Sequence, residues 1–155
     1  MISGASDNVV LNLESDDFID LIVKQLKDNK PVYFYCSTTS KRIDGTWIDL
    51  MERYGDLFDV DLKLDQNSIL MTNGITNCHC MIITGINEVD NKINRWKIEN
   101  SWGKHYGNNG YYVASNEWIN TYVHRIVIDK KYLSKDQLKL LDNKKIKVKK
   151  FENKF

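Results

Sequence analysis

The sequence predicts an α+β domain whose helices come mainly first and whose strands come later and form an antiparallel sheet. Residues 16–28 carry apolar side chains at helical spacing, which indicates an amphipathic helix. The stretches 79–87, 93–100 and 110–114 have the apolar or alternating patterns of strands. This order of elements is typical of α+β proteins.

The first half of the chain holds the predicted helix 16–28 and one strand. Ser15 and the aspartates after it offer an N-cap and a favourable charge for the first turn, and Asp28-Asn29 ends the helix. Pro31 begins a strand over 32–36, where its missing N–H is tolerated. The other predicted elements of this half are a polar loop (37–45), a short helix (45–54), an alternating acidic segment (56–64) and one or two helical turns (66–71).

The second half of the chain is predicted to contain a hairpin with a long connection. The strand 93–100 is followed by a loop with three glycines, Ser101 to Gly110, and a second strand begins at Tyr111. The further predicted elements are a helix (117–122), a strand (123–129) and a last helix (134–141), which Ser134 caps with Gln137 at the capping-box position.

Length and composition indicate one soluble domain over residues 1–155, with residues 142–155 expected to form a loose basic tail. The formal net charge of +1 gives no strong nucleic-acid or membrane signal. No apolar run approaches the roughly 20 residues of a membrane span, and the first residues lack the pattern of a signal peptide. Three cysteines without a regular framework indicate a reducing compartment, so a cytoplasmic protein is expected.

Two polar residues stand at the ends of neighbouring predicted strands. His79 begins one apolar strand and Asn100 ends the next, a separation that suits two strands and a turn. A single histidine usually has a structural role, and we interpret His105 and His124 in this way. An asparagine before a glycine-containing loop is likewise common in ordinary hairpins. A histidine that faces an asparagine, however, provides two members of a Cys-His-Asn catalytic triad.

The segment KIENSWG at residues 97–103, with the Gly-Tyr pair at 110–111, resembles the asparagine segment of papain-like cysteine peptidases. The similarity is greatest to the bleomycin hydrolase and aminopeptidase C branch. It extends from about Asp17 to Leu141 and corresponds to the C-terminal part of that family. The other matching segments are Lys30–Phe34, His79-Cys80-Met81, Thr84-Gly85 as a turn, Trp96 and a tryptophan-bearing helix over 114–122. The resemblance implies the antiparallel, barrel-like sheet half of the papain-like fold, with a few flanking helices.

The resemblance also implies roles for three residues. His79 would be the general acid/base, Asn100 would orient its imidazole ring, and Trp102 would shield the hydrogen bond between them. No cofactor or metal is implied. A zinc site at Cys78-His79-Cys80 is not expected, because alternate residues of a strand point to opposite faces.

The catalytic cysteine of the family lies near the start of a helix in an N-terminal segment, after a glutamine of the oxyanion hole. We find no such segment in this sequence, so no nucleophile is assigned. Cys36 is expected to be a small buried side chain. Cys78 and Cys80 flank His79 and are expected to point to the other face of the strand.

Two hypotheses about function follow. In the first, the chain is a segment of a cysteine peptidase that is inactive alone and acts on peptides when another polypeptide supplies the cysteine and glutamine. In the second, it is a non-catalytic relic or binding module that keeps the fold. An uncovered apolar face is expected to favour self-association or a separate partner chain. The basic tail lacks clustered aromatic residues, which argues against nucleic-acid binding.

Overall fold

The computed structural model describes residues 10–37, 42–43, 46–48, 50–62, 64, 66–71 and 78–142. Its strands are β1 (Val32–Ser37), β2 (Arg42–Ile43), β3 (Thr46–Trp47), β4 (Cys78–Val89), β5 (Lys92–Glu99), β6 (Tyr111–Ser115) and β7 (Val123–Val127). Its helices are α1 (Ser15–Lys27), α2 (Leu50–Phe58), α3 (Gln66–Met71), α4 (Asn116–Tyr122) and α5 (Lys135–Asp142), with a 3-10 helix at Lys130–Tyr132. Much of the predicted loop 37–45 and all of the predicted tail after Asp142 lie outside the described residues.

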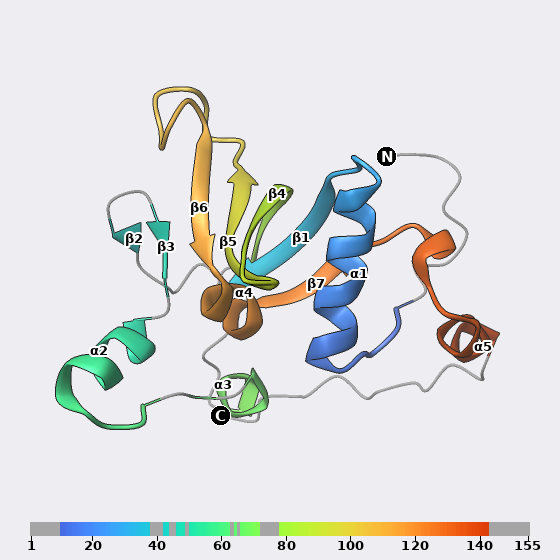
Figure 1. Ribbon diagram of the computed structural model, residues 1–155, viewed down its shortest axis with the longest axis horizontal. Coiled ribbons are helices and arrows are strands. Elements are labelled where there is room, and N and C mark those ends of the chain that lie inside the picture. Colours follow the sequence, from blue (N-terminus) through green and yellow to red (C-terminus); the bar gives the residue numbers. More distant parts are fainter. Residues whose placement is uncertain are drawn as a thin grey trace, which may run out of the picture.

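One sheet connects most of these elements. In the described residues its strand order is β2-β3-β6-β5-β4-β1-β7, and neighbouring strands are antiparallel except β3 beside β6. The strand direction turns markedly from β6 to β7, and α1 and α4 lie against the sheet (Figure 1). The predicted α+β class with a barrel-like sheet is therefore confirmed. No helix in the described part of the chain is long and apolar enough to span a membrane.

Alternation along the strands buries one face of the sheet. In β1, Val32 and Phe34 are fully buried, whereas Tyr33 between them is half exposed. Across the strand pair, Val32 lies opposite Ile83 and Phe34 lies opposite Met81, so apolar residues of β1 and β4 share this face. Each such side chain contributes about 1.5–3 kcal/mol when it is fully buried, which makes this face the main source of stability.

A β-bulge keeps the apolar residues of β4 on the buried face. The pairing of β4 with β5 passes from Ile83 directly to Gly85, which leaves Thr84 as an extra residue. The bulge shifts the alternation by one position, so Ile86 beyond it packs against the same core as Ile83 before it. Thr84-Gly85 is therefore not the turn that the family resemblance implied, because it lies inside one continuous strand.

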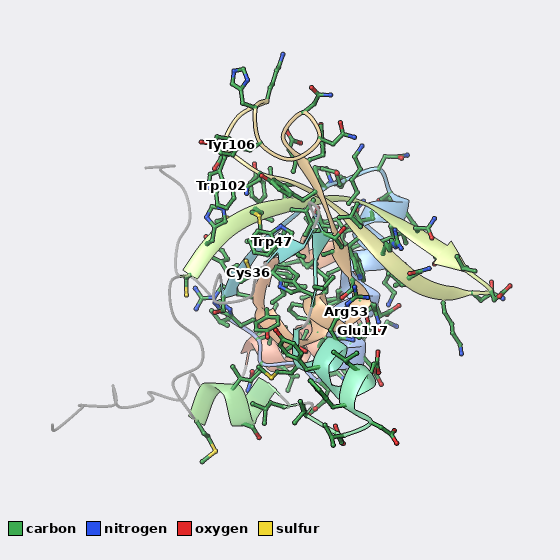
Figure 2. All side chains as sticks on the ribbon, turned by 90° about the vertical axis from the view of Figure 1, so that its left-hand side faces the viewer. Cys36, Trp47, Arg53, Trp102, Tyr106 and Glu117 are labelled. Carbon is green, nitrogen blue, oxygen red and sulfur yellow. The ribbon has the colours of Figure 1, made fainter. Side chains whose placement is uncertain are left out.

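An aromatic cluster joins α4 to the sheet. Trp118 contacts Phe34, Trp47 and Tyr122, with ring centroids 6.4, 5.2 and 6.0 Å apart. The side-chain Oγ of Ser115 accepts a hydrogen bond from the Trp118 backbone N–H at 3.1 Å, which caps the helix that carries Trp118. Figure 2 shows Trp47 deep in the interior of the molecule.

The helix predicted over 45–54 is wrong in its position. Thr46–Trp47 is a strand, and α2 begins three residues after it and takes in the start of the acidic segment 56–64. Pairing of β3 with β6 brings Trp47 to 6.3 Å from the Tyr112 ring, and Trp47 is only 2% exposed there. Burying an indole stabilises the protein by more than the local helical pattern does, since propensity differences are a few tenths of a kcal/mol to about 1 kcal/mol per residue.

The helix cap of α5 agrees with the prediction made from the sequence, whereas that of α1 differs from it. The Ser134 N–H donates to Gln137 Oε1 at 2.9 Å, and the Gln137 N–H donates to Ser134 Oγ at 3.1 Å. This is the predicted capping box. At α1, Ser15 is the first helical residue, and Glu14 holds the cap position without a side-chain hydrogen bond.

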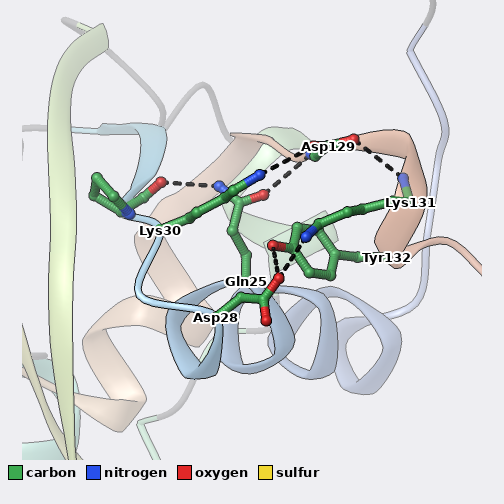
Figure 3. Close-up of polar contacts among 7 residues, drawn as sticks. Gln25, Asp28, Lys30, Asp129, Lys131 and Tyr132 are labelled. Carbon is green, nitrogen blue, oxygen red and sulfur yellow. Dashed lines mark hydrogen bonds and ion pairs between the residues drawn. The ribbon is translucent and has the colours of Figure 1, made fainter.

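A buried glutamine fastens α1 to the sheet and to the segment after β7 (Figure 3). Gln25 Nε2 donates to the Pro31 carbonyl at 2.8 Å, and Gln25 Oε1 accepts from the Asp129 N–H at 3.1 Å. Beside it, the Asp28 carboxylate accepts hydrogen bonds from Lys131 and Tyr132. The hydrogen bond from Lys131 is the main reason why the pKa of Asp28 lies below its usual value, and the bond from Tyr132 lowers it further.

Replacing Gln25 with alanine should leave the Pro31 carbonyl and the Asp129 N–H without their partner. An unsatisfied polar group costs about 1–3 kcal/mol, and these sites are only partly buried, so we expect the free energy of unfolding to fall by about 1–3 kcal/mol. Urea denaturation measures the change. Lys24→Ala, at an exposed position of the same helix, is the matched control and should change stability by less than about 0.5 kcal/mol. Equal effects of the two substitutions would contradict the bridging role of Gln25.

Candidate active site

His79 and Asn100 meet at one end of the buried face of the sheet. His79 lies on the same side of β4 as Met81 and Ile83, and Asn100 directly follows β5, in line with the buried Ile98. The two strands are adjacent and antiparallel, and His79 Nε2 lies 2.9 Å from Asn100 Oδ1. The hydrogen bond predicted between the two side chains is therefore present, with Asn100 only 7% exposed.

The neighbouring backbone decides the orientation of the Asn100 amide and, through it, the protonation of His79. The Ser101 backbone N lies 2.8 Å from Asn100 Oδ1, and a backbone N–H can only donate, so the amide oxygen must stand at this place. That oxygen accepts from His79 Nε2, so Nε2 carries the proton. The neutral ring then has its lone pair on Nδ1, the atom that can take a proton from a nucleophile.

The Trp102 indole lies over the His79 ring. It stacks on the His79 ring with centroids 5.3 Å apart and an interplanar angle of 22°. Tyr106 and Tyr112 contact the indole edge-on at 6.3 and 6.1 Å, and Trp102 and Tyr106 lie together at one end of the molecule (Figure 2). Trp102 is 40% exposed, so the indole lies at the surface of the molecule while it stacks on the His79 ring.

One polar atom of the site has no partner among the described residues. Asn100 Nδ2 is buried there without a hydrogen bond. A buried donor left unpaired costs about 1–3 kcal/mol, so an acceptor supplied from elsewhere would be favourable at this point.

The three cysteines lie where the sequence places them. Cys36 is fully buried opposite His79 on β1, and its thiol donates to the His79 carbonyl oxygen at 3.6 Å. Burial raises the pKa of the Cys36 thiol to about 12, which keeps it protonated and poorly nucleophilic. Cys78 and Cys80 are exposed, and their positions on either side of His79 put them on the opposite face of β4.

One contact near this end of the sheet was not predicted from the sequence. Cys78 Sγ lies 3.6 Å from His124 Nε2. The two residues belong to β4 and β7, which β1 separates in the sheet, and strand order of this kind cannot be inferred from local pattern. His105 is exposed in the loop after β5. In the described part of the chain, no three His, Cys, Asp or Glu side chains gather as a metal site would require.

Comparison with known proteins gives consistent matches. The chain matches the Peptidase C1-like family over residues 1–153. It is 35% identical over 150 residues to Aminopeptidase C of Listeria innocua and 39% identical over 137 residues to Aminopeptidase C of Lactobacillus helveticus. These matches cover 90% and 87% of this chain but only 32% and 30% of the relatives, so the chain spans about a third of their length.

A solved structure shows a similar fold. The crystal structure of PepW from Lactobacillus rhamnosis HN001 superposes with a TM-score of 0.73 and 37% sequence identity. The similarity covers 85% of this chain and 30% of the PepW chain.

We expect His79 to be the Nε2-protonated tautomer at a pH where the ring is neutral, because Asn100 Oδ1 can only accept. Nitrogen-15 NMR of histidine-labelled protein reads the tautomer directly. Asn100→Ala removes the acceptor and should give a mixture of tautomers, whereas Asn108→Ala, in the same loop, should leave the His79 signals unchanged. A wild-type ring protonated mainly on Nδ1 would contradict the assignment.

Two glycines of the loop that carries Trp102 should respond differently to alanine. Both have positive φ, Gly103 at 96° and Gly107 at 61°, which costs about 1–3 kcal/mol for alanine. A Cβ at Gly107 would also lie 2.4 Å from the Tyr111 carbonyl oxygen, whereas one at Gly103 meets nothing within 4 Å. Gly107→Ala should therefore lower the free energy of unfolding more than Gly103→Ala does. Equal losses in urea denaturation would show that the backbone at Gly107 is free to move.

Proposed function

Because the chain belongs to the Peptidase C1-like family, we propose that it supplies the histidine and the asparagine of a cysteine-peptidase active site. His79 is the general acid/base and Asn100 is its orienting partner. The observation that carries the proposal is the 2.9 Å hydrogen bond between His79 Nε2 and Asn100 Oδ1, which leaves Nδ1 as the basic atom.

The proposed chemistry follows from this arrangement of the ring. His79 Nδ1 takes the proton of a cysteine thiol, the thiolate attacks the peptide carbonyl carbon, and the imidazolium then protonates the leaving amine. Asn100 keeps the ring in one orientation throughout, and its neutral amide stabilises the Nε2–H without changing charge. Trp102 keeps water from competing for the His79–Asn100 hydrogen bond.

We propose that the nucleophile comes from outside this chain. The pKa of Cys36 is raised to about 12 by burial, and Cys78 and Cys80 lie on the far face of the strand. The chain corresponds to the C-terminal part of the aminopeptidase C family and spans about a third of the relatives' length. The remaining two thirds of such a protein is the natural source of the cysteine and of the oxyanion hole.

The exposed apolar surface supports a missing partner. Trp102 and Tyr106 are 40% and 55% exposed at the candidate site, and α2 presents further large side chains to solvent. Those of α2 are Met51, Tyr54, Leu57 and Phe58. Large apolar side chains that are exposed close together, as on α2, often mark a contact with another polypeptide. With that partner, the proposed substrate is a peptide shortened from its N-terminus, as the names of the relatives indicate. The three unpaired cysteines favour a cytoplasmic location.

A second candidate function is a binding module without catalysis. The buried state of Cys36 favours it, because burial keeps protonated the thiol that lies opposite His79 on β1. In that case the chain would bind a partner or a peptide through the surface around Trp102 and would not turn over substrate.

We expect the isolated chain to show no hydrolysis of a fluorogenic aminoacyl amide. Mixing it with the part of Listeria innocua Aminopeptidase C that precedes the matched region should restore activity, because that part supplies a thiol for His79 Nδ1. In the mixture, His79→Ala should lower kcat/KM by at least about a hundredfold, as expected for loss of a general acid/base. His105→Ala, an exposed histidine outside the pair, is the matched control and should retain full activity.

Sedimentation of the same mixture separates the two candidate functions. A complex that forms without turnover would favour the binding module. Activity of the isolated chain that Cys36→Ser abolishes would overturn both the external nucleophile and the structural role of Cys36.

A further inference from the structure

A thiol–imidazole pair lies on the face of the sheet opposite the candidate active site. Cys78 Sγ is 3.6 Å from His124 Nε2, within the range of a sulfur–nitrogen hydrogen bond. Cys78 is exposed, so small molecules in solution can reach its sulfur. His124 is half-buried, and burial lowers its pKa, so its ring is neutral near pH 7 and its Nε2 lone pair can accept a hydrogen bond from the thiol.

The strand order and a second bulge create this contact. Register between β1 and β7 shifts at Tyr35 and Cys36, so that His124 is an extra residue between Arg125 and Val123. The intervening strand β1 ends at Ser37, directly opposite Cys78. The Cys78 thiol therefore reaches His124 beside the last residue of that strand.

From this geometry we infer that Cys78 is a reactive thiol and a modification site, at which small disulfides form a mixed disulfide with the chain. The thiol proton passes to His124 Nε2, and the Cys78 sulfur attacks one sulfur of the disulfide. A new sulfur–sulfur bond forms to Cys78 as the original one breaks. The departing thiolate takes the proton from His124 and leaves as a thiol, so the small disulfide is reduced and Cys78 is oxidised.

The neighbouring Cys80 serves as an internal reference for this inference. Cys80 is exposed on the same face, two residues along β4, and lies opposite Tyr35 instead of beside a histidine. Residues two apart in a strand have Cα atoms about 6.6 Å apart and parallel side chains. A disulfide needs Cβ atoms about 3.5–4.5 Å apart, so Cys78 and Cys80 do not resolve the adduct into an internal bond. The mixed disulfide at Cys78 is therefore the stable product.

This inference is independent of the proposed peptidase role, because it involves neither His79 nor Asn100. The test uses the full folded chain and glutathione disulfide as the probe near neutral pH. Mass spectrometry of digested samples gives the initial rate of adduct formation at each cysteine. We expect Cys78 to react about tenfold faster than Cys80, as for a thiol with an adjacent base, and Cys36 to remain unmodified.

Two variants identify the cause of the difference. His124→Gln should reduce the rate at Cys78 to that at Cys80, and Cys80→Ser should leave the rate at Cys78 unchanged. Equal rates at Cys78 and Cys80 in the wild-type chain would overturn the inference without need of any variant. A folded His124→Gln protein that still reacts at the wild-type rate would overturn it as well.

Discussion

The pairing of β4 with β5, with the bulge inside it, is the constraint on which the rest of the structure depends. Before the bulge at Thr84, the odd-numbered residues of β4 face the core, and after it Ile86 does so. A slip of one residue in this pairing would turn every side chain of the strand to the other face. The core and the position of His79 beside Asn100 are therefore set by the same register.

The same alternation gives adjacent residues of β4 opposite chemical surroundings. His79 lies under the Trp102 indole and donates to a buried amide, so its basic atom is fixed. Cys78, one residue earlier, is exposed on the other face and contacts a different histidine. The His79–Asn100 pair and the Cys78–His124 pair thus lie at the same end of the sheet and have no side chain in common, because they occupy opposite faces of β4.

The polar contacts of the candidate site are held by structure outside the two strands. The Asn100 N–H donates to the Gly110 carbonyl at 3.0 Å, which closes the base of the loop between β5 and β6. Tyr112 on β6 supports the indole from its edge, and Trp47 on β3 supports Tyr112 in turn. The orientation of the imidazole is therefore connected to the aromatic core through a continuous series of packed rings.

Residue pattern alone was sufficient to predict the α+β class, the strands around His79 and Asn100 and the capping box of α5, whereas the buried state of Cys36 was predicted from the family resemblance. The first three features depend on local periodicity and on cap chemistry, which a short stretch of sequence contains in full. The pattern misplaced the helix after Trp47, because the burial of that indole depends on β6 and α4, far away in sequence. The bulge at Thr84 was also hidden, since the run from Met81 to Ile83 is apolar throughout and has no alternation to interrupt.

Only the tertiary structure decided which atoms of these side chains contact one another. The tautomer of His79 depends on the Ser101 N–H that orients the Asn100 amide, and this is a matter of atomic position. The contact of Cys78 with His124 depends on the place of β1 between β4 and β7 and on where β1 ends. Sequence thus determined which residues could carry chemistry, and the long-range pairing of strands determined their partners, because hydrogen bonds between distant segments are fixed by packing and leave no local pattern.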